Sequence, residues 1–222
     1  KHTFPAAKEH VLPIYGLYDN YENTVVITLG NGQTTQVRIK VKELNVNKAL
    51  YCHTTYEYFG KDLMLLSTTT PLIDSCRSVG FDYAGDLRWM ITNMQSWDIK
   101  KLANGRLLYT SYRTIQKPYY CVGLTEMDLC GKIYKEYRLP GGVHHDAVEL
   151  ENGNILAASD NDFNDSVEDY VVELDRATGN ILKSWDLKNI LPRELGNAGD
   201  WNYHDWFHNN AVWYDKPTNS IT

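Results

Sequence analysis

Two stretches of the chain repeat each other and determine the fold: Asp98-Ile-Lys-Lys-Leu-Ala-Asn104-Gly105-Arg-Leu-Leu-Tyr-Thr-Ser111 and Asp146-Ala-Val-Glu-Leu-Glu-Asn152-Gly153-Asn-Ile-Leu-Ala-Ala-Ser159. Their Asn-Gly pairs lie 153 − 105 = 48 residues apart, and the flanking apolar positions match one for one. Alternating strands around Asn-Gly are typical of β-hairpins, because this pair supplies the positive φ angles of a two-residue turn. The sequence therefore predicts one hairpin in each copy.

Each copy continues into a second unit with an Asp-x-x-Gly or Asp-x-x-x-Gly turn, at Asp128 to Gly131 and at Asp175 to Gly179. An earlier relative contains Asp82, and we interpret all three aspartates as turn-forming residues. Two hairpins make a four-stranded sheet of about 45–50 residues, the size of a propeller blade. We thus expect an all-β chain with one partial blade (residues 49–92), two complete ones (93–140 and 141–188) and a further hairpin that starts at Asn210.

The first 45 residues lack this blade pattern. They hold an alternating hairpin, Thr24 to Leu29 and Thr35 to Val41 around Gly-Asn-Gly, which predicts part of a separate small β-sandwich-like domain. The predicted division is 1–45 and 46–222, the latter an incomplete propeller of about three and a half blades. Because a propeller needs at least about four blades to close, we expect these residues to be part of a longer chain and to be inactive by themselves.

Composition excludes several classes of partner. A net charge of −6 argues against a nucleic-acid binder. No run of about 18 apolar residues occurs, which argues against a membrane span. The four cysteines form no CxxC pair, so a zinc ribbon is unsupported. One or two disulfides and four free thiols are equally compatible with the sequence. The oligomeric state, possibly a homodimer, is not determined by it.

Histidines gather at two places that the repeat makes equivalent. Gly141-Gly-Val-His144-His145-Asp146 enters the first strand of a blade, and Asp205-Trp206-Phe-His208-Asn-Asn210 stands one repeat later. The alignment puts His208 at the position of His144 and Asn210 at that of Asp146. Innermost strands of successive blades line one central channel, so we expect these histidines to face each other there.

Such a site suits an aryl ester of an anion. Imidazoles donate hydrogen bonds to anionic oxygens and act as acid, base or nucleophile, while aromatic residues such as Trp206 can stack an aromatic ring. Three alternatives remain open: histidines that only bond local carbonyls, a propeller that binds an anionic or aromatic ligand without chemistry, and a metal-dependent sulfatase or phosphatase. The metal alternative would use His144, His145, Asp146 and His208, but His204-x-x-x-His208 lacks the glutamate of His-Glu-x-x-His.

On these motifs the chain resembles the bacterial arylsulfotransferase family, the aryl-sulfate sulfotransferases that work without the nucleotide sulfate donor. The matching segments include Leu12-Pro-Ile-Tyr-Gly-Leu-Tyr18, Gly85-Asp-Leu-Arg-Trp89, His144-His145-Asp146 and Asp205-Trp206-Phe-His208-Asn-Asn210. The double histidine and the Asp-Trp-x-His-x-Asn string are the specific parts of the resemblance.

The resemblance implies a periplasmic, secreted or cell-surface enzyme with a six-bladed propeller and no cofactor or metal. It implies sulfuryl transfer from a phenolic sulfate ester to a phenol through a sulfated histidine. His208 and one of His144 and His145 would bind the sulfuryl oxygens, with the repeat alignment favouring His144, and Asn210 and Trp206 would contact the substrate. The sulfated histidine and a sulfate-binding arginine belong to later segments of the family pattern.

Overall fold

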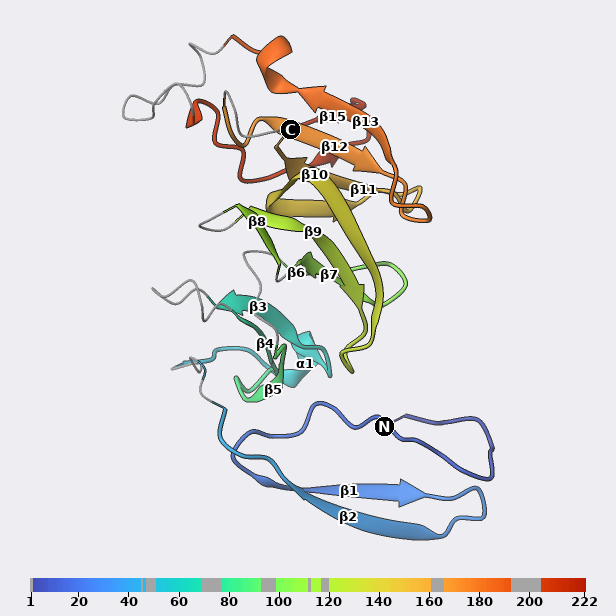
Figure 1. The fold of residues 1–222 in the computed structure, drawn as a ribbon. Helices are drawn as coiled ribbons and strands as arrows, with labels where there is room; N and C mark the ends of the chain where they lie inside the picture. The colour runs from blue at the N-terminus through green and yellow to red at the C-terminus, as the bar shows by residue number, and fades with distance from the viewer. Residues whose placement is uncertain are drawn as a thin grey trace. The chain divides into compact units, whose positions relative to one another are not determined.

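The computed structural model describes residues 2–44, 46, 51–68, 77–92, 99–111, 113–116, 120–160, 166–192 and 205–222. These residues form antiparallel sheets (Figure 1) with short helices only at α1 (Tyr56–Phe59) and the 3-10 turn η2 (Leu187–Asn189), so the all-β prediction is confirmed. The chain divides into two compact units, Lys1–Leu66 with Val79–Ile91, and Ser67–Ser78 with Thr92–Thr222.

In the first unit, β1 (Glu22–Thr28) and β2 (Thr34–Lys40) pair in the predicted hairpin, with Val25 opposite Val37. A three-stranded sheet follows, in the order β3 (Met64–Thr68), β4 (Arg77–Phe81) and β5 (Leu87–Met90). Its core is a small cluster made of Val79, Phe81, Leu87, Leu44, Val46 and Met90.

The second unit holds two four-stranded antiparallel parts that share one long strand, β10 (Ile133–Glu149). The first part contains β6 (Ile99–Lys101), β7 (Leu107–Thr110), β9 (Tyr120–Met127) and the first half of β10, with β8 (Thr114–Gln116) beside β9. The second part contains the end of β10, β11 (Ile155–Ser159), β12 (Tyr170–Leu174) and β13 (Ile181–Asp186). Figure 1 shows β10 running through both parts. These parts correspond to the predicted blades 93–140 and 141–188. No sheet closes on itself among the described strands, so the propeller and the division at residues 45 and 46 stay predictions.

β10 changes partners where its regular geometry breaks. Arg138 pairs with β9, Ala147 pairs with β11, and Val143 between them pairs with both. Gly142 directly precedes Val143 and has a φ of 78°, and His145 follows Val143 by two residues and has a φ of 58°. Irregularities of this kind bend a strand and redirect side chains. The irregular segment contains both predicted histidines of β10.

The turns confirm one prediction and correct another. Asp82, Asp128 and Asp175 each accept a hydrogen bond from the backbone N–H two residues ahead, at 3.0, 2.9 and 2.7 Å, and are turn-forming as predicted. The prediction of a two-residue Asn-Gly turn is wrong.

The hairpin loop in the first repeat has three residues, and both hydrogen bonds that close it involve the backbone of Leu102. The N–H of Gly105 donates to the carbonyl of Leu102, and the N–H of Leu102 donates to the carbonyl of Arg106, both at 2.8 Å. Gly105 has a φ of 81°, whereas Asn104 is not among the residues with positive φ. A type I turn followed by a left-handed glycine needs only one positive φ, which is why Asn104 keeps an ordinary conformation.

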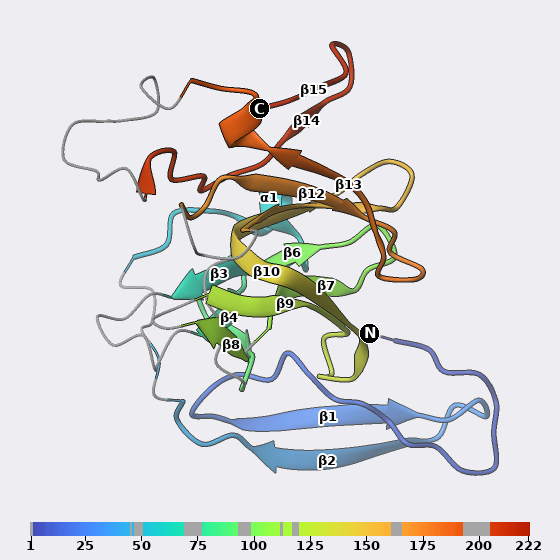
Figure 2. The ribbon, with the colours of Figure 1, turned by 45° about the horizontal axis from the view of Figure 1, so that its top comes forward.

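Two apolar clusters hold the second unit together. One spans both four-stranded parts and consists of Leu102, Leu108, Leu124, Tyr137, Leu139, Val143, Ala147, Ile155, Ala157, Val172 and Leu174. The other joins Leu156 and Val171 to Tyr214 and Ile221 of the hairpin β14 (Tyr214–Asp215) and β15 (Ser220–Ile221). Figure 2 shows the two strands of this hairpin. This hairpin is the predicted third copy, and it brings the segment before it, residues 205–213, onto the second part.

Among the described residues, Cys52 and Cys130 are free thiols, and Cys76 lies outside them. None of the described helices is long and apolar enough to cross a membrane.

Candidate active site

The three predicted histidines converge. The ring centroids of His144 and His145 lie 4.0 Å apart, and those of His144 and His208 lie 6.0 Å apart. His144 is 1% exposed, whereas His145 and His208 are half-buried. Residues 64 positions apart in the sequence thus meet at the irregular segment of β10.

A buried carboxylate joins two of these rings. Glu168 precedes β12 and is 1% exposed, and its Oε1 lies 3.0 Å from Nε2 of His144. Its Oε2 lies 2.9 Å from Nδ1 of His208. Asp205 approaches the same Nδ1, with both carboxylate oxygens at 3.0 Å. Because carboxylates only accept hydrogen bonds, His208 presents a protonated Nδ1 to them and would contact a ligand through Nε2.

His144 is enclosed on both sides. Its Nδ1 lies 3.3 Å from the backbone carbonyl of Asn209, in addition to the contact with Glu168. Burial, together with the neighbouring His145 and His208, lowers the pKa of His144 to about 3, although the Asn209 hydrogen bond raises it. The ring is therefore neutral at pH 7 and carries one proton. Because a carbonyl only accepts hydrogen bonds, the contact with Asn209 places that proton on Nδ1, while Nε2 lies 3.0 Å from Oε1 of Glu168.

Backbone strain gathers at the same place. Five non-glycine residues of the described chain have positive φ: Asn20, His145, Glu168, His208 and Asn219. Asparagine tolerates the left-handed region, and histidine does so more than most residues, but glutamate does not. Three of the five therefore meet in one cluster, with Glu168 at φ 61° as the clearest outlier. Strained residues of this kind persist where the surroundings hold them and are concentrated at functional sites.

The neighbour of Glu168 provides the scaffold. Asp169 is fully buried and accepts hydrogen bonds from Nε1 of Trp206 at 2.8 Å, from Nζ of Lys188 at 2.9 Å and from the hydroxyl of Ser166 at 2.6 Å. The N–H of Asn209 donates to the carbonyl of Glu168 at 3.1 Å. These bonds fix residues 205–209 against the start of β12, which explains why His208 reaches His144.

The remaining predicted residues lie as follows. Trp206 is 1% exposed and serves as an anchor in this structure, so its contact with substrate stays a prediction. Asn210 is exposed. Asp146 accepts from Nζ of Lys100 at 2.7 Å and from the N–H of Val212 at 3.0 Å, which gives it a structural task. His204 lies outside the described residues.

Sequence reasoning missed Glu168, Asp169 and Asp205. A signal was present for the first two: Glu173 aligns with Glu126, 173 − 126 = 47 positions earlier, so Glu168 and Asp169 stand where the previous repeat has Cys121 and Val122. An acidic pair in place of two apolar residues marks a site where this repeat does something the other does not. Glu168, Asp205 and His208 also place one ligand atom each within 4.8 Å of one another and could hold a cation.

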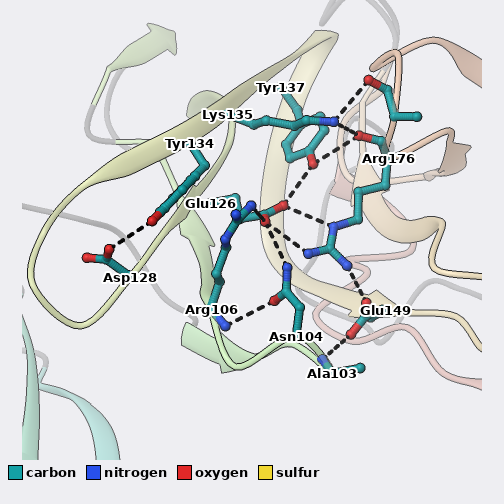
Figure 3. Close-up of polar contacts among 11 residues, drawn as sticks. Ala103, Asn104, Arg106, Glu126, Asp128, Tyr134, Lys135, Tyr137, Glu149 and Arg176 are labelled. Atoms are coloured by element: carbon teal, nitrogen blue, oxygen red, sulfur yellow. Dashed lines mark hydrogen bonds and ion pairs between the residues drawn. The ribbon is translucent and has the colours of Figure 1, made fainter. Parts of the chain in front are cut away.

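A second buried glutamate has a different environment (Figure 3). Glu126 in β9 is 1% exposed and accepts from Arg106 at 2.7 Å, from Arg176 at 2.9 and 3.0 Å and from Asn104 at 3.3 Å. Burial by itself raises its pKa, but the bonds from Arg176, Arg106 and Asn104 outweigh it and lower the pKa to about 2. Arg176 also donates to Glu149, so this cluster ties the two four-stranded parts together.

Fold and site together define an all-β repeat protein in which successive repeats supply histidines to one buried carboxylate. Residues 48–222 match the family described as arylsulfotransferase (ASST), and residues 1–43 match the arylsulfotransferase Ig-like domain. The chain belongs to the arylsulfotransferase family, as the resemblance predicted. This membership indicates an activity of the aryl sulfotransferase type for the intact protein. No match was found among curated proteins or among solved structures.

Proposed function

We propose that the intact protein transfers a sulfuryl group from a phenolic sulfate ester to a phenol. The observation that carries the proposal is the convergence of His144, His145 and His208 around Glu168 in a chain of this family. The strained backbone at this cluster costs stability in any case, and strain of this kind is concentrated at functional sites.

In the overall reaction, the bond between sulfur and the donor's aryl oxygen breaks, and a bond between sulfur and the acceptor's oxygen forms. The proton of the acceptor hydroxyl ends on the released donor phenol. We propose that a histidine nucleophile carries the sulfuryl group between two half-reactions. In the first, the S–O bond to the donor breaks and an S–N bond to the histidine forms. In the second, that S–N bond breaks and an S–O bond to the acceptor forms. The resemblance assigns that histidine and a sulfate-binding arginine to later segments of the family pattern.

His145 and His208 are the best placed to hold the sulfuryl oxygens. Both rings are half-buried, whereas His144 is enclosed by Glu168 and Asn209. Hydrogen-bond donors held in position before the reaction stabilise the charge that develops on those oxygens. His144 would then support the site rather than contact the sulfuryl group, which departs from the preference that the repeat alignment gave. Asn210 and Trp206 remain proposed substrate contacts.

The wider setting follows from the same resemblance. We propose that the intact protein is exported to the periplasm or cell surface, that its repeats form a six-bladed propeller, and that its partners are small aryl sulfates and phenols. The proposed reaction uses no cofactor and involves neither a nucleic acid nor a membrane. A homodimer stays an open prediction.

The test is transfer of sulfate from 4-nitrophenyl sulfate to phenol by the intact protein. We expect nitrophenol release that requires phenol and produces phenyl sulfate in equal amount. Release that proceeds at the same rate without phenol would make the protein a hydrolase and refute the proposal.

A metal-dependent hydrolase is the second candidate, because Glu168, Asp205 and His208 offer three ligand atoms close together. The same assay with a chelator separates the two candidates. Unchanged transfer favours the sulfotransferase, while activity that is lost with the chelator and restored by a divalent cation favours the hydrolase. Binding of aryl sulfate without turnover would instead favour a binding module.

A further inference from the structure

Glu168 has the geometry of an orienting group. Its two carboxylate oxygens face two different histidines, Nε2 of His144 at 3.0 Å and Nδ1 of His208 at 2.9 Å. The carboxylate thus spans two segments that are 64 residues apart in the chain, and each oxygen addresses one of them. We propose that Glu168 is the positioning residue of the site, which fixes the orientation of both rings for sulfuryl transfer; this role rests on the function proposed above.

Burial makes this arrangement informative. Glu168 is 1% exposed, and a carboxylate that leaves water pays a large desolvation cost unless its oxygens are hydrogen-bonded. Glu126, which is equally buried, offsets that cost with two arginines. Glu168 faces imidazoles instead, one of which is neutral because burial lowers the pKa of His144. Stability alone would be served better by permanent cations, so the choice of histidines points to a use.

The backbone supports the same assignment. Glu168 has a φ of 61°, a conformation that disfavours a side chain with a Cβ. Its carbonyl accepts from the N–H of Asn209 at 3.1 Å, and the carbonyl of Asn209 faces Nδ1 of His144 at 3.3 Å. Glu168, Asn209 and His144 therefore form a closed ring of contacts. The strained backbone at Glu168 aims its side chain into the cluster.

Asp205 and Glu168 differ in the histidines that their carboxylates contact. Its oxygens contact only His208 among the three histidines, and its side chain is 31% exposed. It can help to orient His208 but leaves His144 untouched. Glu168 is therefore the group on which the relative placement of the two rings depends.

The experiment compares Glu168→Gln with Glu173→Gln in the intact protein. Glutamine keeps the size, the backbone and one carbonyl oxygen, but it carries no charge and cannot present an oxygen to both rings at once. Glu173 lies five residues later, is also buried, and is bonded to Asn154 and Lys183 away from the histidines. We expect Glu168→Gln to lower kcat by about 100-fold or more with KM changed by less than about threefold, and Glu173→Gln to keep both. An unchanged kcat in folded Glu168→Gln protein would overturn the proposal.

A second measurement does not depend on activity. In the wild-type protein labelled with ¹⁵N-histidine, the ring ¹⁵N shifts of His144 and His208 should each report a single tautomer. These shifts should be kept in Glu173→Gln and should change in folded Glu168→Gln. Shifts that are the same in Glu168→Gln and in the wild type refute the role of Glu168. Absence of sulfate transfer with the expected shifts present refutes the proposed function instead, so the two failures are distinguishable.

Discussion

Glu126 and Glu168 are equally buried, but their side chains contact groups of different chemistry. Each is 1% exposed, and each joins segments that are far apart in the sequence. Glu126 lies within the regular strand β9 and faces two guanidinium groups, which are always charged. Glu168 has a left-handed backbone and faces two imidazoles, of which His144 is neutral at pH 7 because burial lowers its pKa to about 3.

The difference separates a structural cluster from a functional one. The arginines lower the pKa of Glu126 to about 2, so that cluster stays ionised over the physiological range and does not respond to its surroundings. Around Glu168 the partners are imidazoles, whose ring nitrogens donate or accept according to where the proton lies. A site that must bind an anion and move protons needs such groups, while a joint between the two four-stranded parts does not. Three changes break or sharpen the comparison.

The largest effect is expected from removing a histidine that faces Glu168. His208→Gln in the intact protein should lower kcat/KM for 4-nitrophenyl sulfate by about 100- to 1000-fold, because one positioned donor to the sulfuryl oxygens is lost. His10→Gln, at an exposed histidine of the first unit, is the matched control and should retain full activity. Equal activity of the two variants would remove His208 from the site.

Replacing Glu126 should reverse this pattern. Glu126→Gln removes the buried carboxylate that two partly buried guanidiniums share, so we expect about 2–4 kcal/mol less unfolding free energy in urea at pH 7, with kcat/KM within about threefold of wild type. Because the folded-state pKa of Glu126 is lowered from 4.5 to about 2, its advantage is complete above pH 4.5 and lost as the pH falls towards 2.

The stability difference between wild type and Glu126→Gln should therefore shrink over that acid range. His144 titrates in both proteins, so its contribution cancels from the difference. A gap that stays constant from pH 7 to pH 3 would show that the charge of Glu126 is not what stabilises the joint.

The smallest effect is expected from Asn154→Ala, which removes a donor to Glu173, the residue equivalent to Glu126 in the next repeat. Glu173 accepts from Asn154 at 2.8 Å where Glu126 accepts from Arg106, and its partner Lys183 is 64% exposed. Asn154→Ala should cost about 1 kcal/mol, because a single neutral donor is lost and exposed ion pairs contribute little. Urea unfolding at pH 7 measures it. A loss as large as that of Glu126→Gln would mean that the two repeats are held in the same way.

Local patterns were sufficient for much of the fold. Alternating apolar residues around Asn-Gly and Asp-x-x-Gly predicted the hairpins, and Asp82, Asp128 and Asp175 form turns as expected. The type of the Asn-Gly turn was wrong, because Asn104 and Asn152 fit both a two-residue and a three-residue loop and the strand ends decide between them. The single strand β10, shared by the two four-stranded parts, was not foreseen, because Pro140-Gly141-Gly142 in its middle is a typical turn signal and yet lies within the strand.

The sequence by itself determined that this chain is a β-repeat protein of the arylsulfotransferase family with histidines at equivalent positions. Those features depend on residue spacing, which is local and repeats along the chain. Only the tertiary structure brought Glu168 between His144 and His208, and only it enclosed His144 while leaving His145 half-buried. A carboxylate 24 residues from one ring and 40 from the other has no periodicity that links it to them. Its role arises from burial and from hydrogen bonds across segments, which exist only once the sheets have packed.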